Sequence, residues 1–140
     1  ERESARLGLS DQLTFLGPLA EDETLALYAE ADLFLFTGKT APDGDRDGVP
    51  NVIPEAMAAG NVVLTSSSGG AAEVVEHGKT GYVLDPDSPG EWVETLRFLL
   101  RAPETVPALR REARARARRR FEVKRAGREL LAALRQACER

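Results

Sequence analysis

Two carboxylates eight positions apart, Asp47 and Glu55, are the residues whose types and spacing most directly suggest chemistry. Asp47 lies in a glycine-containing loop. Glu55 lies in the first turns of a predicted helix, whose free backbone N–H groups and partial positive charge suit a phosphate. Gly48 would let the backbone approach a ligand closely. A helical carboxylate can accept two hydrogen bonds from a ribose diol, and a loop carboxylate can accept them from sugar hydroxyls. The segment 47–55 therefore predicts a site for a phosphate flanked by two polyols.

The elements that must position these carboxylates alternate along the chain. Short apolar runs predict strands at 13–16, 33–36, 62–65 and 82–84. Amphipathic or capped segments predict helices at 21–31, 51–60, 71–76, 88–100, 106–120 and 123–139. The alternation predicts an α/β fold, a parallel sheet with flanking helices, and in such sheets ligands bind at the carboxyl ends of the strands.

Several residues predict where these helices begin and end. Asn51 is predicted to cap the helix of the second carboxylate, and Gly60 to end it. Pro54 falls at the third helical position, where a missing N–H is harmless. Ser88 is a predicted N-cap, and Glu91 is predicted to complete a capping box with it.

A long polar loop at 37–50 leads into the helix of the second carboxylate. It holds three glycines, two prolines and three aspartates, and a loop of this length is usually functional. We interpret Lys39 and Arg46 as solvated charges, with contact to a phosphate as the alternative. The segment 66–70 reads as a plain strand-to-helix turn, with a phosphate-binding nest as the alternative. His77 is interpreted as a turn residue at a helix end.

Length and composition indicate one globular domain. The chain has 140 residues, of which 42% are hydrophobic and 30% charged, and this excludes collagen-like, disordered and membrane-spanning classes. One cysteine, Cys138, excludes an intramolecular disulfide and a Cys-rich zinc site, and one histidine argues against a Ser-His-Asp triad. The chain does not begin with Met, so we expect a piece of a longer protein, with a processed chain as the alternative. No signal peptide is visible, and we expect a cytoplasmic location, with a peripheral position at the membrane as the alternative.

Charge is distributed unevenly along the chain. Residues 1–100 carry 6 Lys and Arg against 18 Asp and Glu, whereas residues 101–140 carry 13 against 5. Seven arginines lie within 110–120, around an apolar stripe formed by Leu109, Ala113, Ala117 and Phe121. We interpret them as a solvated helix face, with contact to an anionic membrane surface as the alternative. Nucleic acid is not expected as a partner, because aromatic residues are missing between the arginines.

The segment 47–65 closely resembles the acidic-x7-acidic signature of retaining, nucleotide-sugar-dependent glycosyltransferases of group 1, the family-four enzymes with a GT-B fold. The resemblance continues in segments 13–18, 27–32 and 69–81 and covers nearly the whole chain. Members of this family have two Rossmann-like domains with the active cleft between them. The resemblance implies that this chain belongs to the C-terminal, donor-binding domain, with a partial Rossmann-like part at 1–105 and C-terminal helices at 106–140.

The resemblance also implies roles for individual residues. Glu55 matches the residue that holds the ribose, and Asp47 matches the catalytic acidic residue beside the donor sugar. The other matching positions line the sugar, the diphosphate and the base: Gly48, Val49, Asn51, Gly17 and Leu19. Two departures are visible, because Asp47 stands where the family commonly has Glu, and Pro50 stands where it commonly has Gly. The basic pair that neutralises the diphosphate would lie upstream of this chain.

The implied reaction moves a sugar from a nucleoside diphosphate to a hydroxyl of an unidentified acceptor, with retention and without a metal or other cofactor. This chain alone is expected to be inactive without an N-terminal acceptor domain. The alternative is a non-catalytic nucleotide-sugar-binding module whose basic helix contacts anionic membranes. By resemblance, two strands would separate 13–16 from 33–36, so we expect 13–16 to move beside 33–36, or a second copy to fill the gap.

Overall fold

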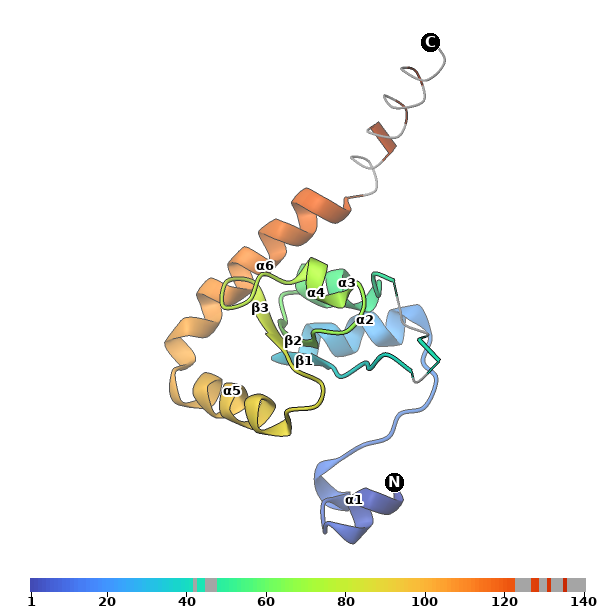
Figure 1. Ribbon diagram of the computed structural model, residues 1–140, viewed down its shortest axis with the longest axis vertical. Helices are drawn as coiled ribbons and strands as arrows, with labels where there is room; N and C mark the ends of the chain where they lie inside the picture. Colours follow the sequence, from blue (N-terminus) through green and yellow to red (C-terminus); the bar gives the residue numbers. More distant parts are fainter. Residues whose placement is uncertain (42, 45–47, 123–126, 129–130, 132–134, 136–140) are drawn as a thin grey trace.

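The protein is an α/β structure built on a three-stranded parallel sheet (Figure 1). The computed structural model describes residues 1–41, 43–44, 48–122, 127–128, 131 and 135. The strands are β1 (Leu33–Phe36), β2 (Val62–Ser66) and β3 (Gly81–Leu84), in the order β1-β2-β3. Leu33 pairs with Val62 and Val63 with Gly81, and both pairings are parallel. The α/β class and three of the four predicted strands are therefore confirmed.

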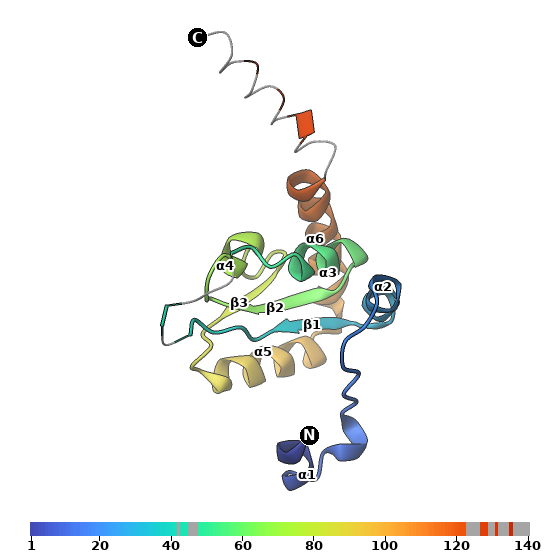
Figure 2. The same ribbon diagram turned by 90° about the vertical axis from the view of Figure 1, so that its right-hand side faces the viewer.

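Helices cover both faces of this sheet (Figure 2). One face carries α3 (Val52–Ala59), α4 (Ala71–Val74) and α6 (Val106–Phe121), and the other carries α5 (Pro89–Arg101). The central strand β2 is buried along its whole length, and its alternate side chains serve two cores. Val63 packs with the first group of helices, whereas Val62 and Leu64 pack with the α5 side. Burial on both faces explains why β2 is a continuous apolar run.

Helix α2 (Glu21–Glu30) lies beside the sheet and is held at both ends. At its start, a carboxylate oxygen of Glu23 accepts a hydrogen bond of 2.8 Å from the amide of Ala20. At its end, Asn61 Nδ2 donates to the carbonyls of Tyr28 and Ala31, at 2.9 and 2.6 Å. These last two bonds satisfy carbonyls that a helix end leaves without an intrahelical partner.

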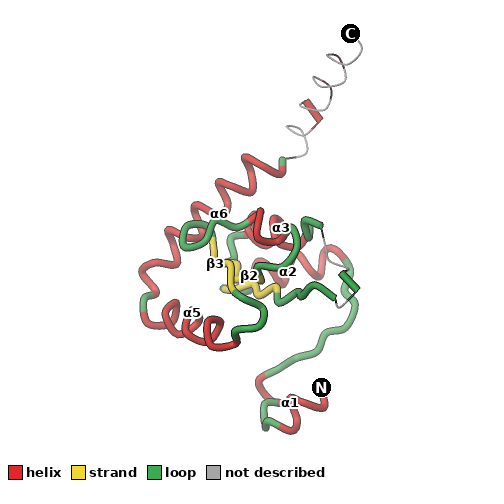
Figure 3. Tube along the Cα trace, viewed as in Figure 1, coloured by secondary structure: helices red, strands yellow, loops and turns green. Residues whose placement is uncertain are grey.

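The N-terminal segment differs from the prediction at two points. A five-residue helix, α1 (Arg2–Arg6), forms where none was predicted, and it is followed by a 3-10 turn at Ser10–Gln12. The predicted strand 13–16 was wrong, since these residues form an extended loop (Figure 3). Leu13, Phe15 and Leu16 are about half exposed, and no described strand lies beside them to supply backbone partners. The expected move of this segment next to β1 does not occur.

The helix ends confirm some of the predicted signals and contradict others. Gly60 ends α3 with φ of 101°, and Pro54 occupies the third position of that helix. Asn51 stands at the N-cap position, but its backbone is helical and its side chain makes no cap. The capping box of α5 is wrong too, because the Ser88 side chain does not cap and Glu91 accepts from the Asp85 amide at 3.1 Å.

The chain after the sheet is helical as predicted. A short 3-10 turn at Pro103–Thr105 joins α5 to α6. The predicted helix 123–139 falls mostly outside the described residues, as does Cys138. Among the residues that the structure describes, no helix has the length and apolarity needed to span a membrane.

Candidate functional site

Three loops meet at the carboxyl edge of the sheet, where ligands of such folds bind. They follow β1, β2 and β3, and hydrogen bonds join them to one another. The Gly70 amide, after β2, donates to the Gly48 carbonyl at 3.0 Å, and the Ser67 amide donates to the Leu84 carbonyl at 2.8 Å. The long loop after β1 is also tied down by an ion pair in which Lys39 Nζ lies 2.5 Å from Asp87 Oδ1.

The contact between Gly48 and Gly70 fixes how closely two of these loops approach. A Cβ atom added at Gly70 would lie within 3.0 Å of the Gly48 carbonyl, which real Cβ atoms do not tolerate. A Cβ added at Gly48 would meet nothing within 4 Å. Gly70 is therefore a glycine because the protein crowds it. The side-chain position of Gly48 instead faces open space, where a ligand could approach.

Glu55 lies in the first turn of α3 and is exposed. It borders a pocket of about 500 Å³ between α3 and α6, which is lined by Asn51, Pro54, Glu55, Ala58, Ala117, Arg118, Phe121 and Glu122. Its negative charge also acts on α2. Burial, and then the charge of Glu55, raise the pKa of the Tyr28 phenol above its ordinary value. The pocket thus brings the carboxylate predicted to bind ribose to the start of a helix, where a phosphate is stabilised.

The opposite wall of this pocket belongs to α6. Several arginines of α6 are not simply exposed to solvent but bind other elements of the fold. Arg114 donates to the Ala59 carbonyl at 2.6 Å, which is at the end of α3. Arg110 reaches Asp32 just beyond α2, with 2.5 Å to Oδ1 and 3.3 Å to the carbonyl oxygen. Cations are favourable at the negative end of a helix dipole, so these arginines anchor α2 and α3 to α6.

Two further arginines of α6 hold the end of α4. Arg116 donates from Nε to the Val74 carbonyl at 2.6 Å and from a terminal nitrogen to the Glu73 carbonyl at 3.1 Å. Arg120 donates to the same Glu73 carbonyl at 2.9 Å. Arg116 also pairs with Glu76, and hydrogen bonding from Lys79, followed by the charge of Arg116, lowers the pKa of that carboxyl. The interpretation of 110–120 as a simple solvated face was therefore wrong for these residues.

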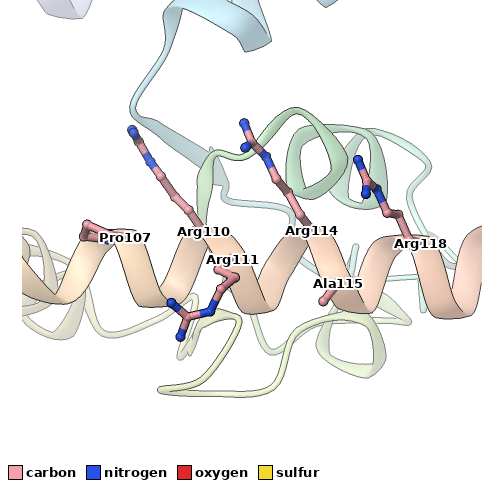
Figure 4. Close-up of a pocket in the computed structure, with 6 residues that line it drawn as sticks. All are labelled: Pro107, Arg110, Arg111, Arg114, Ala115 and Arg118. Carbon is pink, nitrogen blue, oxygen red and sulfur yellow. The ribbon is translucent and has the colours of Figure 1, made fainter.

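Three arginines of α6, Arg110, Arg114 and Arg118, form a row on one side of the helix. Figure 4 shows Arg110, Arg114 and Arg118 pointing to the same side, one helical turn apart, whereas Arg111 points away. All four of these arginines border a second pocket of about 550 Å³, together with Pro107 and Ala115. Local sequence patterns missed this arrangement, because the carbonyls that bind Arg114 and Arg116 lie 55 and 42 positions away.

The structure gathers only part of the predicted site. Glu55 and Asn51 share the α3–α6 pocket, and Gly48 and Val49 lie in the loop that leads to it. Gly17 and Leu19 are exposed in the segment that joins α1 to α2, and this segment approaches the sheet at the α2 end rather than at the carboxyl ends of the strands (Figure 2). Asp47 and Arg46 fall outside the described residues. The roles assigned to these residues stay predictions.

Among the described residues, His77 has a structural environment and the acidic side chains form no metal-binding group. The His77 ring packs edge-on against Tyr82, and its Nδ1 lies 3.2 Å from the amide and 3.0 Å from the carbonyl of Val83. The histidine thus links a turn to β3, in agreement with its predicted structural role. Within the described part of the chain, no three His, Cys, Asp or Glu side chains group to hold a metal ion. The expectation that no metal is required stays a prediction.

Comparison with known proteins decides the family. The family described as "Glycosyl transferases group 1" matches residues 1–120. The chain belongs to the group 1 glycosyl transferases. Among curated relatives, a GDP-mannose-dependent alpha-(1-6)-phosphatidylinositol monomannoside mannosyltransferase of Mycobacterium tuberculosis is 42% identical over 94 residues, covering 66% of this chain and 24% of the relative.

Solved structures agree with this membership in group 1. Anabaena Alr3699/HepE in complex with UDP is 30% identical, has a TM-score of 0.85, and matches 96% of this chain and 35% of its own. Sucrose-phosphate synthase of Thermosynechococcus elongatus has a TM-score of 0.84 over 99% of this chain, and at 22% identity it supports the fold alone. The chain spans about a quarter to a third of the length of the relatives and neighbours that it matches.

Proposed function

We propose that this chain is the donor-binding part of a longer glycosyltransferase that moves a sugar from a nucleoside diphosphate to an acceptor hydroxyl, with retention. The observation that carries the proposal is Glu55 in the first turn of α3, open to the α3–α6 pocket, in a chain of the group 1 family. A similar protein, Alr3699/HepE, has been solved with UDP and with UDP-glucose, and this supports a nucleotide sugar as the donor.

Each residue of the site has a chemical part in this proposal. The Glu55 carboxylate accepts hydrogen bonds from the two ribose hydroxyls, which are stronger than neutral ones because the acceptor is charged. Asp47 is the catalytic residue beside the donor sugar. Backbone groups of Gly48, Val49 and Asn51 surround the sugar and the diphosphate, with the positive end of α3 stabilising the leaving diphosphate.

Other parts of the site lie at a distance in this chain. Gly17 and Leu19 would form the wall near the base once the N-terminal segment is placed by further strands. The basic groups that neutralise the diphosphate, and the domain that binds the acceptor, are proposed to belong to other parts of the longer enzyme. Charge stabilisation by helix dipole and basic side chains makes a metal unnecessary in this scheme.

The test is nucleotide affinity, measured by calorimetry with UDP and with GDP, in the full-length enzyme and its variants. Glu55→Ala removes a charge-assisted contact, so binding should weaken by about 1.5–3 kcal/mol. The matched control is Glu104→Ala, an exposed carboxylate in the turn before α6, and it should leave affinity unchanged. Equal affinities of the Glu55 variant and the unchanged enzyme would refute the ribose assignment.

The catalytic part of the proposal needs a separate measurement. Asp47→Asn should spare nucleotide binding and cut the turnover number. A loss of binding equal to the loss of turnover would mean that Asp47 orders the loop instead. Nucleotide binding without any sugar transfer by the full-length protein would favour the alternative, a non-catalytic nucleotide-sugar-binding module.

A further inference from the structure

Arg118 differs from its neighbours in the row of arginines along α6. Arg110 and Arg114, two turns and one turn before it, hydrogen-bond to Asp32 and to the Ala59 carbonyl. Arg118 is exposed, and within the described part of the chain it makes neither a hydrogen bond nor an ion pair. Its guanidinium therefore keeps all five of its N–H donors for a ligand.

Arg118 also borders the pocket that contains Glu55. The α3 wall of that pocket supplies the Glu55 carboxylate, the α6 wall supplies the Arg118 guanidinium, and Glu122 lines the pocket just beyond α6, which leaves Arg118 as the one cation among its described lining residues. Glu55 and Arg118 line the same pocket of about 500 Å³ without forming an ion pair with each other. A site with a free anion and a free cation on facing walls matches a ligand that offers hydroxyl donors to one and negative charge to the other.

A ribose that carries a phosphate has this chemistry. The diol donates to the carboxylate, and the guanidinium presents a planar fork that binds phosphate oxygens through two parallel hydrogen bonds. The positive end of α3 adds to the attraction for a phosphate near Asn51. Arg118 is the arginine of this row that remains available to bind a phosphate, because Arg114 is already bound to a backbone carbonyl and Arg110 to Asp32.

We propose that Arg118 binds a phosphate of the nucleotide whose ribose is held by Glu55. The inference rests on the proposed function and adds to it a determinant from α6, a helix outside the acidic segment 47–55. Arg118 thereby makes the pocket selective for phosphorylated nucleosides over the nucleoside alone, and α6 both holds the α3 helix and forms part of the ligand site.

The experiment measures the affinities of uridine, UMP and UDP by calorimetry, or of the guanosine series if GDP binds more tightly. It uses the full-length enzyme and its Arg118→Gln variant. We expect UMP and UDP to bind about tenfold to a hundredfold more weakly to the variant, and uridine to bind within about twofold of the unchanged enzyme. Raising the salt concentration should weaken UDP binding to the unchanged enzyme more than to the variant.

Two further variants keep the test decisive. Arg111→Gln removes the same charge from the same helix but from the side that faces away, so it should leave all three affinities unchanged. Arg118→Lys keeps the charge and loses the fork, so its UDP affinity should fall between those of the enzyme and Arg118→Gln. Thermal unfolding should give the same midpoint for all of them, since Arg118 has no partner in the described structure.

Distinct outcomes separate this inference from the proposed function. Unchanged UDP affinity in Arg118→Gln, while Glu55→Ala loses it, would overturn the role of Arg118 and leave the proposed function standing. An equal loss of uridine and UDP in Arg118→Gln would also overturn it, because Arg118 would then shape the pocket rather than bind phosphate. If the unchanged enzyme binds none of these nucleotides, the proposed function itself fails.

Discussion

The arginines near the C-terminal end of this chain and the apolar residues near its N-terminal end lie in environments opposite to those that their residue types suggest. At the C-terminal end, the arginines of α6 look like surface charges in the sequence, but Arg114 and Arg116 are bound to helix-end carbonyls of α3 and α4. At the N-terminal end, Leu13, Phe15 and Leu16 look like a buried strand, but they lie exposed in a loop. Charge is used for packing at one end, and apolar surface is left in water at the other.

This contrast indicates which part of the structure is complete in itself. On the α3–α4–α6 side, arginines of α6 bind carbonyls at the C-terminal ends of α3 and α4, and a continuous core that includes Ile53, Met57 and Ala113 is buried. The N-terminal segment and the β1 edge have no such partners among the described residues. The candidate site lies on the complete side, so we expect its geometry to be retained in a longer protein. The N-terminal segment would be rearranged there.

The largest effect is expected at Arg116, whose side chain is 17% exposed and bonded to two carbonyls at the end of α4. Arg116→Met keeps most of the apolar stem, removes the donor to the Val74 carbonyl and removes the ion pair with Glu76, whereas the Glu73 carbonyl still accepts from Arg120. The free energy of unfolding should fall by about 3 kcal/mol, since a hydrogen bond from a charged donor to a part-buried carbonyl and an ion pair are both lost. Urea unfolding followed by circular dichroism measures this.

The control for this variant is Arg111→Met on the outer side of α6. Its side chain is 72% exposed and its contact to Glu112 is 3.6 Å, so stability should change by less than about 0.5 kcal/mol. If both variants lose the same small amount, the α6 arginines are surface charges after all, and the contrast between the two ends of the chain disappears.

A smaller effect is expected at the loop contact that borders the site. Gly70→Ala would force its Cβ against the Gly48 carbonyl, so the two loops must separate at a cost of about 2 kcal/mol. Gly48→Ala is the matched control, because a Cβ there meets no protein atom within 4 Å. Urea unfolding should therefore show a loss for the first variant alone. Equal losses from both would mean that the Gly48 loop is itself packed against protein.

The sequence predicts the elements of the sheet well where burial decides them. The apolar runs that became β1, β2 and β3 were visible in the sequence, and burial on both faces accounts for the run in β2, which is buried at every position. Strand β1 is only partly buried, and its Leu35 is 43% exposed. The run at 13–16 has the same pattern and forms no strand. An apolar run reports that a segment is suited to burial, but it does not report whether partner strands are present.

The candidate site could be predicted only where local patterns report it. Glu55 and Asn51 were placed at the start of a helix on the carboxyl edge, and the structure has them there. Arg118 could not be assigned from the sequence, because its place opposite Glu55 depends on how α6 crosses α3. Ser88 and Glu91 are a case in which a local pattern predicted a contact that does not form. They were expected to make a capping box, but Glu91 accepts a hydrogen bond from the Asp85 amide instead.

The smallest effect on stability is expected at the N-terminal end, where it would sharpen the contrast. Phe15 and Leu16 are 57% and 51% exposed, so the double variant Phe15→Ser with Leu16→Ser should change the free energy of unfolding by less than about 0.5 kcal/mol. The same double variant should instead change the self-association of the chain. An open strand edge and exposed apolar residues each recruit further chains, so the isolated 140-residue chain should gain average mass by light scattering as its concentration rises, and the double variant should gain less. A loss of stability above about 1 kcal/mol would show that this segment is packed in solution, since exposed side chains contribute little to folding. Equal association of both chains would mean that the β1 edge alone recruits the second copy.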